Sequence, residues 1–204
     1  MTDSGTREKD GREWQIGGAT EAAWINEGSE SGVRITSAIP PIFDAYATIL
    51  QPGWVEKDEG EVRSSSATSD QIRKHELAIV AELESHSAPQ PWWLGFLETG
   101  EENIVFTDAP TVKLYAGWPY VLVEAGPEQA RTWRDHGHNG ALPDLMFPAD
   151  HSWLLSNLWD DCWAYVGGPR DLVDDLLAHP DLGGLAREVD PSMADATPPG
   201  FTAY

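Results

Sequence analysis

The sequence predicts a single α+β domain, with a mainly antiparallel sheet of about five to seven strands and two or three helices packed on one face of that sheet. Apolar segments within 92–123 follow one another too closely for the crossover helices that parallel strands require. An amphipathic helical pattern covers 70–85, and a strand, turn, strand and helix pattern covers 153–178. These three observations favour the antiparallel α+β class.

The length of 204 residues is enough for one domain with a sizeable core. Hydrophobic residues make up 41% of the chain and include ten Trp, so buried apolar surface can offset the lost chain entropy. Composition divides the chain into three parts. Residues 1–12 are expected to be a flexible lead, 13–187 the single α+β domain, and 188–204 an irregular Pro-rich tail.

The first third of the chain predicts short elements. A helix is expected over 20–27 and a strand over 33–35. The segment 38–50 has two interpretations. Pro41 suits the first position of a helix, whereas the Tyr, Thr and Ile that follow suit a strand, which we favour. The charged, Ser-rich segment 51–68 is expected to be a long mobile loop.

The helix expected over 70–85 has the strongest local signals. Thr68 and Gln71 have the spacing of a capping box, in which each side chain bonds to the backbone of the other. Pro89 and Pro91 follow the helix and prevent its continuation. The apolar residues on one helical face are Ile72, Ile79, Val80 and Leu83.

Strands are expected over 92–97, 104–106 and 112–115. A strand, a corner containing Gly and Pro, and a helix then occur twice, over 120–133 and 162–176. In both copies the proline, Pro127 or Pro169, can take the first helical position, where its missing N–H has no cost. The pattern indicates two examples of a common strand-to-helix corner.

A hairpin is expected before the second corner. Asp160 and Asp161 are residues that a tight two-residue turn tolerates. The strand pairs that this turn predicts are Trp159 with Cys162 and Leu158 with Trp163. A helix over 169–178 is expected to follow, with Pro180 stopping it. Its buried residues are predicted to be Leu172, Val173, Leu176 and Leu177.

The formal net charge is −21, and acidic residues are spread along the chain. Such a field repels nucleic acid and anionic membranes, so neither is an expected partner. It attracts basic proteins and cationic small ligands, which are the partners that the sequence favours. The acidity also fits a simple role in solubility. The oligomeric state is not indicated.

The compartment expected from the sequence is the cytoplasm. Cys162 is the single cysteine, so no internal disulfide forms, which fits a reducing environment. The first ten residues are polar and lack the apolar core of a secretory signal. No apolar run approaches the roughly 18 residues of a membrane-spanning helix.

Several motifs in order carry a family resemblance. They are A-Y-x-x-I-x-x-P over 45–52, Trp92-Trp93, P-A-D-x-x-W over 148–153 and Y-V-G-G over 165–168. Over about 38–182 the chain resembles an uncharacterised family of bacterial proteins from GC-rich genomes. Members often have His where this chain has Gln51, and Arg where it has His151. The resemblance implies one continuous domain, and the family has no known activity to carry over.

The predicted function is that of a non-enzymatic binding module for a basic protein, in the manner of an immunity protein or antitoxin, or for a cationic small ligand. The predicted site is an acidic turn beside aromatic rings, formed by Trp159, Asp160, Asp161 and Trp163. Trp on strands more often packs in the core, which is the competing interpretation. No catalytic signature and no cofactor motif is present.

The alternative is a metal-dependent hydrolase. His136 and His138 form a His-x-His pair, and His151 lies in another polar turn, so the three could hold a divalent metal. Histidines in flexible loops are far commoner than such sites. Cys162 as a nucleophile is disfavoured, because the adjacent Asp161 raises the pKa of the thiol. A half-buried strand cysteine is the better interpretation.

Overall fold

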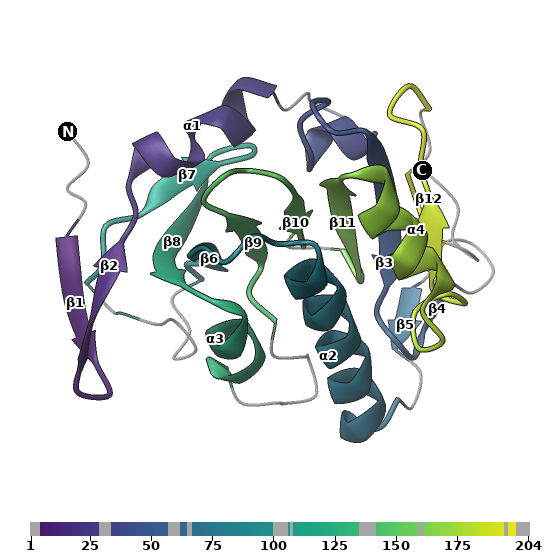
Figure 1. Ribbon diagram of the computed structural model, residues 1–204, viewed down its shortest axis with the longest axis horizontal. Coiled ribbons are helices and arrows are strands. Elements are labelled where there is room, and N and C mark those ends of the chain that lie inside the picture. Colours follow the sequence, from purple (N-terminus) through teal and green to yellow (C-terminus); the bar gives the residue numbers. More distant parts are fainter. Residues whose placement is uncertain are drawn as a thin grey trace.

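The computed structural model describes residues 5–28, 34–56, 62–64, 67–99, 106, 108–134, 142–158, 161–193 and 196–198 (Figure 1). The helices are α1 (Ala19–Gly28), η1 (Ile35–Ser37, a 3-10 turn), α2 (Ser69–Ser85), α3 (Pro127–Thr132) and α4 (Arg170–Ala178). The first strands are β1 (Gly5–Lys9), β2 (Arg12–Ile16), β3 (Ala45–Leu50), β4 (Trp54–Glu56), β5 (Val62–Ser64) and β6 (Trp92–Leu97). The later strands are β7 (Val112–Leu114), β8 (Trp118–Ala125), β9 (Leu145–Pro148), β10 (Leu154–Ser156), β11 (Trp163–Gly168) and β12 (Ala186–Glu188).

Ten of these strands form one sheet, in the order β1-β2-β8-β6-β9-β10-β11-β3-β12, with β7 paired to β8. Every pairing among the described strands is antiparallel. The predicted α+β class with a mainly antiparallel sheet is therefore confirmed. The sheet has more strands than expected, because short segments near both ends of the described chain add to it.

The central strands bury both of their faces. In β8, Val121 and Val123 belong to one apolar cluster, while Tyr120 and Leu122 belong to the cluster on the opposite face. In β6 the same alternation places Trp92, Leu94 and Phe96 on the first face. Antiparallel sheets more often expose one face to water. This one is the middle layer of three.

Three helices cover the first face, as predicted. α2, α3 and α4 contribute Leu83, Ala130 and Leu176 to the cluster there. The opposite face is covered by α1, through Ala22 and Ile25, together with η1. Figure 1 shows α1 and α2 on opposite sides of the sheet. This second cover differs from the prediction, which placed helices on one face only.

Helix α2 begins where the capping box predicts. The Thr68 hydroxyl accepts a hydrogen bond from the Gln71 backbone N–H at 3.2 Å, and the Thr68 N–H donates to the Gln71 side chain at 2.9 Å. Ile79, Val80 and Leu83 are buried, and Ile72 is half-buried. The predicted helix and its core face are confirmed.

The hairpin of β10 and β11 is also confirmed. Ser156 pairs with Tyr165. The predicted pair of Leu158 with Trp163 has the same register, since it lies two residues nearer the turn on each strand. That pair is not itself part of the ladder, and Trp159 lies outside the described residues. The Asp161 N–H donates to the Leu158 carbonyl at 3.1 Å. The two-residue turn at Asp160 and Asp161 stays a prediction, because Asp160 also lies outside the described residues.

Both strand-to-helix corners form, but their prolines differ. Pro127 is the first residue of α3, whereas Pro169 is the N-cap of α4. The second corner is tightly packed at Gly167 and Gly168. A Cβ on Gly167 would lie 2.5 Å from Ile39 and Phe43 side-chain carbons. Glycine is therefore required there by close packing.

The prediction of a flexible lead over 1–12 is wrong for the residues described. β1 and β2 form an antiparallel hairpin, and the turn residues Asp10 and Gly11 have φ of 55° and 71°. Two consecutive positive φ values are what a type I′ turn requires, and Asp-Gly is a strong sequence signal for it. The many charged residues of this segment led to the prediction of a flexible lead, although an edge strand exposed to water also carries charged residues.

Two further expectations are corrected. The strand expected over 33–35 does not form, since Ile35 begins η1 and Val33 lies outside the described residues. The expected loop over 51–68 contains β4 and β5, which pair as a separate two-stranded sheet. The strand favoured within 38–50 is confirmed only from Ala45 onward. Most of the strand expected over 104–106 lies outside the described residues.

The tail begins as part of the sheet. Glu188 closes β12, and the next residue, Val189, is buried and donates its N–H to the Tyr46 carbonyl at 2.9 Å. The described residues beyond it have irregular backbone, with Ala196 and Thr197 buried. No helix among the described residues is long and apolar enough to cross a membrane.

Replacing Trp153 with Ala is expected to destabilise the protein by about 3–5 kcal/mol, because a large buried ring leaves a cavity. Trp153 is 0% exposed, packs edge-on against Trp92 at 4.7 Å, and donates its indole N–H to the Ser87 hydroxyl at 2.8 Å. Chemical denaturation measures the change. Trp54→Ala, at a half-buried position outside the core clusters, serves as control. Equal unfolding midpoints for wild type and Trp153→Ala would contradict the packing.

Gly167→Ala should lower the free energy of unfolding by about 1–3 kcal/mol, the usual cost of overpacking, because Ile39 and Phe43 must move. Gly184→Ala is the matched control, since a Cβ there meets no atom within 4 Å. Thermal melts of the two variants give the comparison. A Gly167→Ala protein as stable as Gly184→Ala would show that this corner has room for a side chain.

Candidate functional site

The predicted acidic and aromatic turn is described only in part. Trp159 and Asp160 lie outside the described residues. The Asp161 carboxylate accepts a hydrogen bond from the Tyr165 hydroxyl at 2.7 Å. The half-buried Trp163 ring meets the Tyr165 ring edge-on at 6.1 Å. Asp161 therefore has a structural partner, and binding at this turn stays a prediction.

The other Trp residues of interest belong mainly to the core. Trp92 and Trp153 are buried and pack against each other. Trp93 is half-buried and packs against the cluster on the opposite face. The competing interpretation, in which Trp residues on strands fill the core, holds for Trp92 and Trp153.

Only one residue of the alternative metal site is described. His136 and His138 lie outside the described residues. His151 is stacked on the Trp24 ring with centroids 4.5 Å apart, and burial lowers the pKa of its imidazole. A metal site at these three histidines stays a prediction.

Cys162 has the environment of a structural cysteine. Its side chain is 7% exposed, just before β11. Burial, with a smaller contribution from the charge of Asp161, raises the pKa of the thiol to about 12. A nucleophilic cysteine needs the opposite shift, so the thiol stays protonated at neutral pH.

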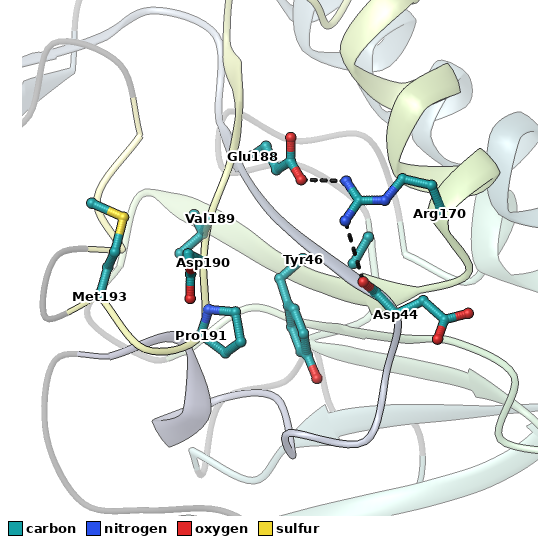
Figure 2. Close-up of a pocket in the computed structure, with 9 residues that line it drawn as sticks. Asp44, Tyr46, Arg170, Glu188, Val189, Asp190, Pro191 and Met193 are labelled. Atoms are coloured by element: carbon teal, nitrogen blue, oxygen red, sulfur yellow. Dashed lines mark hydrogen bonds and ion pairs between the residues drawn. The ribbon is translucent and has the colours of Figure 1, made fainter.

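A surface pocket of about 390 Å³ lies at the other end of β11, beyond Gly168 (Figure 2). It is built where three separate segments meet: the start of β3, the start of α4 and the residues after β12. The residues that give it chemical character are Asp44, Tyr46, Arg170, Glu188, Asp190 and Met193.

Strand pairing places these residues together. β3 lies between β11 and β12, with Ala45 opposite Gly168 and Ala47 opposite Glu188. Asp44 therefore precedes β3 at the same edge where α4 begins with Arg170. Since the polar residues sit at the ends of paired strands, the pocket depends on the sheet register.

The one guanidinium of the pocket has partners already. Arg170 forms an ion pair with Glu188 and donates to the Asp44 backbone carbonyl at 3.3 Å, as Figure 2 shows. The Asp190 carboxylate accepts hydrogen bonds from the Ser192 N–H and hydroxyl, and these bonds lower the pKa of Asp190. The pocket is thus lined by three carboxylates and one guanidinium, so its rim is negative at neutral pH.

The pocket also has apolar and aromatic surface. The Tyr46 side chain is buried beneath it, with its hydroxyl accepting the Phe43 N–H at 2.9 Å. Met193 is 51% exposed, which is unusual for a large apolar side chain. A long cationic side chain can place its alkyl stem on such surface and its charge at the carboxylates.

The pocket continues into a wider acidic surface, defined here by the exposed carboxylates of Asp44, Asp171, Asp174, Asp175, Glu188 and Asp190. Helix α4 contributes three of them on the side facing water, opposite its buried Leu172, Val173 and Leu176. The fields of Asp174 and Asp44 both act on the Arg170 guanidinium. Acidic side chains therefore extend from the pocket along α4, where Asp171 and Asp175 lie beside His86.

Sequence reasoning missed this pocket. Asp190 and Met193 fell in the expected tail, and Asp44 in a segment of ambiguous structure. The weak signal present was the excess of acidic residues after position 140, where Arg170 and Arg187 are the only Arg or Lys. That excess indicates an acidic region and not a pocket.

Comparisons with known proteins add no assignment: no family model matches this chain, and neither the curated proteins nor the solved structures contain a match. The resemblance carried by the sequence motifs accordingly stays a prediction.

His75 gives a prediction for the pH dependence of stability. It is 4% exposed on α2, and burial lowers its pKa from 6.5 to about 4. Between pH 6.5 and pH 4 the imidazole is protonated in the unfolded chain and neutral in the folded protein. The contribution of His75 to stability is therefore complete above pH 6.5 and is lost as the pH falls towards 4. The loss from this group is about 3 kcal/mol.

Urea denaturation of wild type and His75→Gln from pH 7.5 to 4 tests this. The difference between the two proteins should shrink as pH falls, because the variant lacks the titrating imidazole. Carboxylates titrate in both proteins and cancel in the comparison. A difference that stays constant across the range would show that His75 is not held neutral.

Proposed function

We propose that this protein is a non-enzymatic binding module for a basic protein, and that a Lys or Arg side chain of the partner enters the pocket beside Asp44, Glu188 and Asp190. The observation that carries the proposal is the negative rim of that pocket, together with the further exposed carboxylates on α4. The partner class is the one that the net charge of −21 favours.

The pocket chemistry supports a cation. Arg170 holds Glu188 in place, while the Asp44 carboxylate is exposed and the Asp190 carboxylate is kept ionised by its bonds to Ser192. An arriving guanidinium or ammonium group gains charge-assisted hydrogen bonds without needing to displace a buried ion pair. Met193 offers a contact for the alkyl part of the same side chain.

A protein partner is favoured over a small cation for one reason. The acidic surface extends past the pocket onto Asp171, Asp174 and Asp175 of α4, further than a small ligand can reach. Charges beyond the contact steer the encounter with a basic protein and raise its association rate. A cytoplasmic location, suggested by the single, buried cysteine, is part of the same proposal.

The experiment compares two proteins of equal charge. Asp44→Asn with Asp190→Asn removes two charges at the pocket, and Asp70→Asn with Asp108→Asn removes two exposed charges elsewhere. Binding of a ten-residue Lys/Arg peptide, measured by calorimetry at low salt, should weaken by about 1–2 kcal/mol, roughly 5–30-fold, in the pocket variant. The control variant should bind almost as wild type does. An equal loss of affinity in both variants would show that binding depends only on net charge, and would overturn the proposal that the pocket is the binding site.

A second arm separates the partner classes. Affinity purification from lysate is repeated at low and moderate salt, and a basic protein should be retained by wild type, lost as salt rises, and not retained by the pocket variant. Binding of small diamines without any protein partner would replace the proposal with a small-ligand function. No binding by peptide, protein or diamine at low salt would end it.

A further inference from the structure

A second group of chemically active side chains lies between α2 and α4, away from the pocket. Glu82 and His86 are one turn apart at the end of α2, so they lie on one face of that helix. Asp175 is on α4, which contacts α2 there. One donor atom from each of the three lies within 4.8 Å of the others, so a single metal ion can reach all three after small side-chain movements.

The imidazole of His86 is oriented as a metal ligand is. Its Nε2 lies 2.9 Å from an Asp175 carboxylate oxygen, and its Nδ1 lies 3.6 Å from the Asp171 carboxylate. Metal-bound histidines commonly direct their second nitrogen at a carboxylate, which fixes the tautomer and raises the basicity of the first. Asp171 can take this role, and Nε2 can then exchange its hydrogen bond with Asp175 for a bond to the metal.

His179 has a different place in the cluster. Its Nδ1 accepts the Asp181 backbone N–H at 3.1 Å, so the proton of the neutral ring is on Nε2. That Nε2 lies 3.9 Å from the Glu82 carboxylate. His179 therefore lies beside Glu82 and does not offer a lone pair to a metal.

The charge of the cluster is not balanced by cations. Three carboxylates surround His86, and no Lys or Arg in the described chain pairs with Glu82, Asp171 or Asp175. His86 is also the C-cap of α2, where the helix dipole is negative. Its side chain is 14% exposed, while that of Asp175 is 58% exposed, which leaves a path for an ion from water.

We propose that Glu82, His86 and Asp175 bind a divalent transition-metal ion, with water completing its coordination and Asp171 orienting His86. One imidazole nitrogen and two carboxylate oxygens suit Zn²⁺ or Mn²⁺. Before binding, Nε2 carries the proton that it donates to the Asp175 carboxylate. On binding, Nε2 releases this proton to water and gives its lone pair to the ion, while Nδ1 takes up a proton from water and directs it at Asp171. The ion thus replaces the hydrogen bond of Nε2 to Asp175. The ion ties the end of α2 to α4. It is separate from His136, His138 and His151.

The test uses Zn²⁺ alone as the probe, titrated by calorimetry into metal-free full-length protein. Wild type should bind one equivalent and melt at a higher temperature with Zn²⁺, because only the folded chain assembles the site. His86→Gln and Asp175→Asn should each lose this binding. Asp171→Asn should weaken it by about tenfold or more, as removal of an orienting carboxylate does. Co²⁺ gives a visible spectrum that should disappear in His86→Gln.

Two control variants keep the result specific. Asp174→Asn removes a carboxylate next to Asp175, exposed and outside the cluster, and should bind as wild type does. His138→Ala should also bind normally, and loss of binding there would assign the metal to the His-x-His pair instead. Absence of one-to-one binding by wild type, or its survival in both His86→Gln and Asp175→Asn, would overturn the proposal. Circular dichroism of each variant checks that it is folded.

Discussion

Burial of the sheet on both faces is the constraint on which the rest of this structure depends. The central strands are apolar at consecutive positions, as Trp92 to Leu97 show, so neither side of the sheet can be left to water. One layer of helices satisfies one face only. The second face needs α1, η1 and the segment after β12, whose Val189 and Ala196 join its cluster. Segments that look peripheral in the sequence are thus required by the core.

This constraint explains what the sequence could predict. Local signals succeeded where a few neighbouring residues decide the outcome, as with the Thr68 and Gln71 cap of α2 and the register of the β10–β11 hairpin. Two or three helices on one face were predicted from local helical patterns, and α2, α3 and α4 lie there. The prediction of a flexible lead failed because polar composition was taken as a sign of disorder. The Asp10-Gly11 turn instead joins two strands of a hairpin, and these strands are charged because they lie at the edge of the sheet.

The candidate pocket could not be predicted for a different reason. Asp44 and Glu188 are far apart in sequence, and only the pairing of β3 with β12 makes them neighbours. Neither residue has a motif around it, and acidic residues are common throughout the chain. The same holds for Glu82 and Asp175, whose distance depends on how α2 and α4 cross the sheet. A sequence pattern indicates the acidity of such sites and the long-range packing determines their geometry.

Helix α4 connects the two sites physically. Its apolar face, through Leu172, Val173 and Leu176, is held against the sheet, so the helix cannot move without disturbing the core. Its first residue, Arg170, anchors the pocket through Glu188, and Asp175 one turn further on faces α2. Concentrating carboxylates on the outer face of one helix costs stability through mutual repulsion, which a cation at either site relieves. The acidic face of α4 is therefore best understood as a surface whose charge is balanced by what it binds.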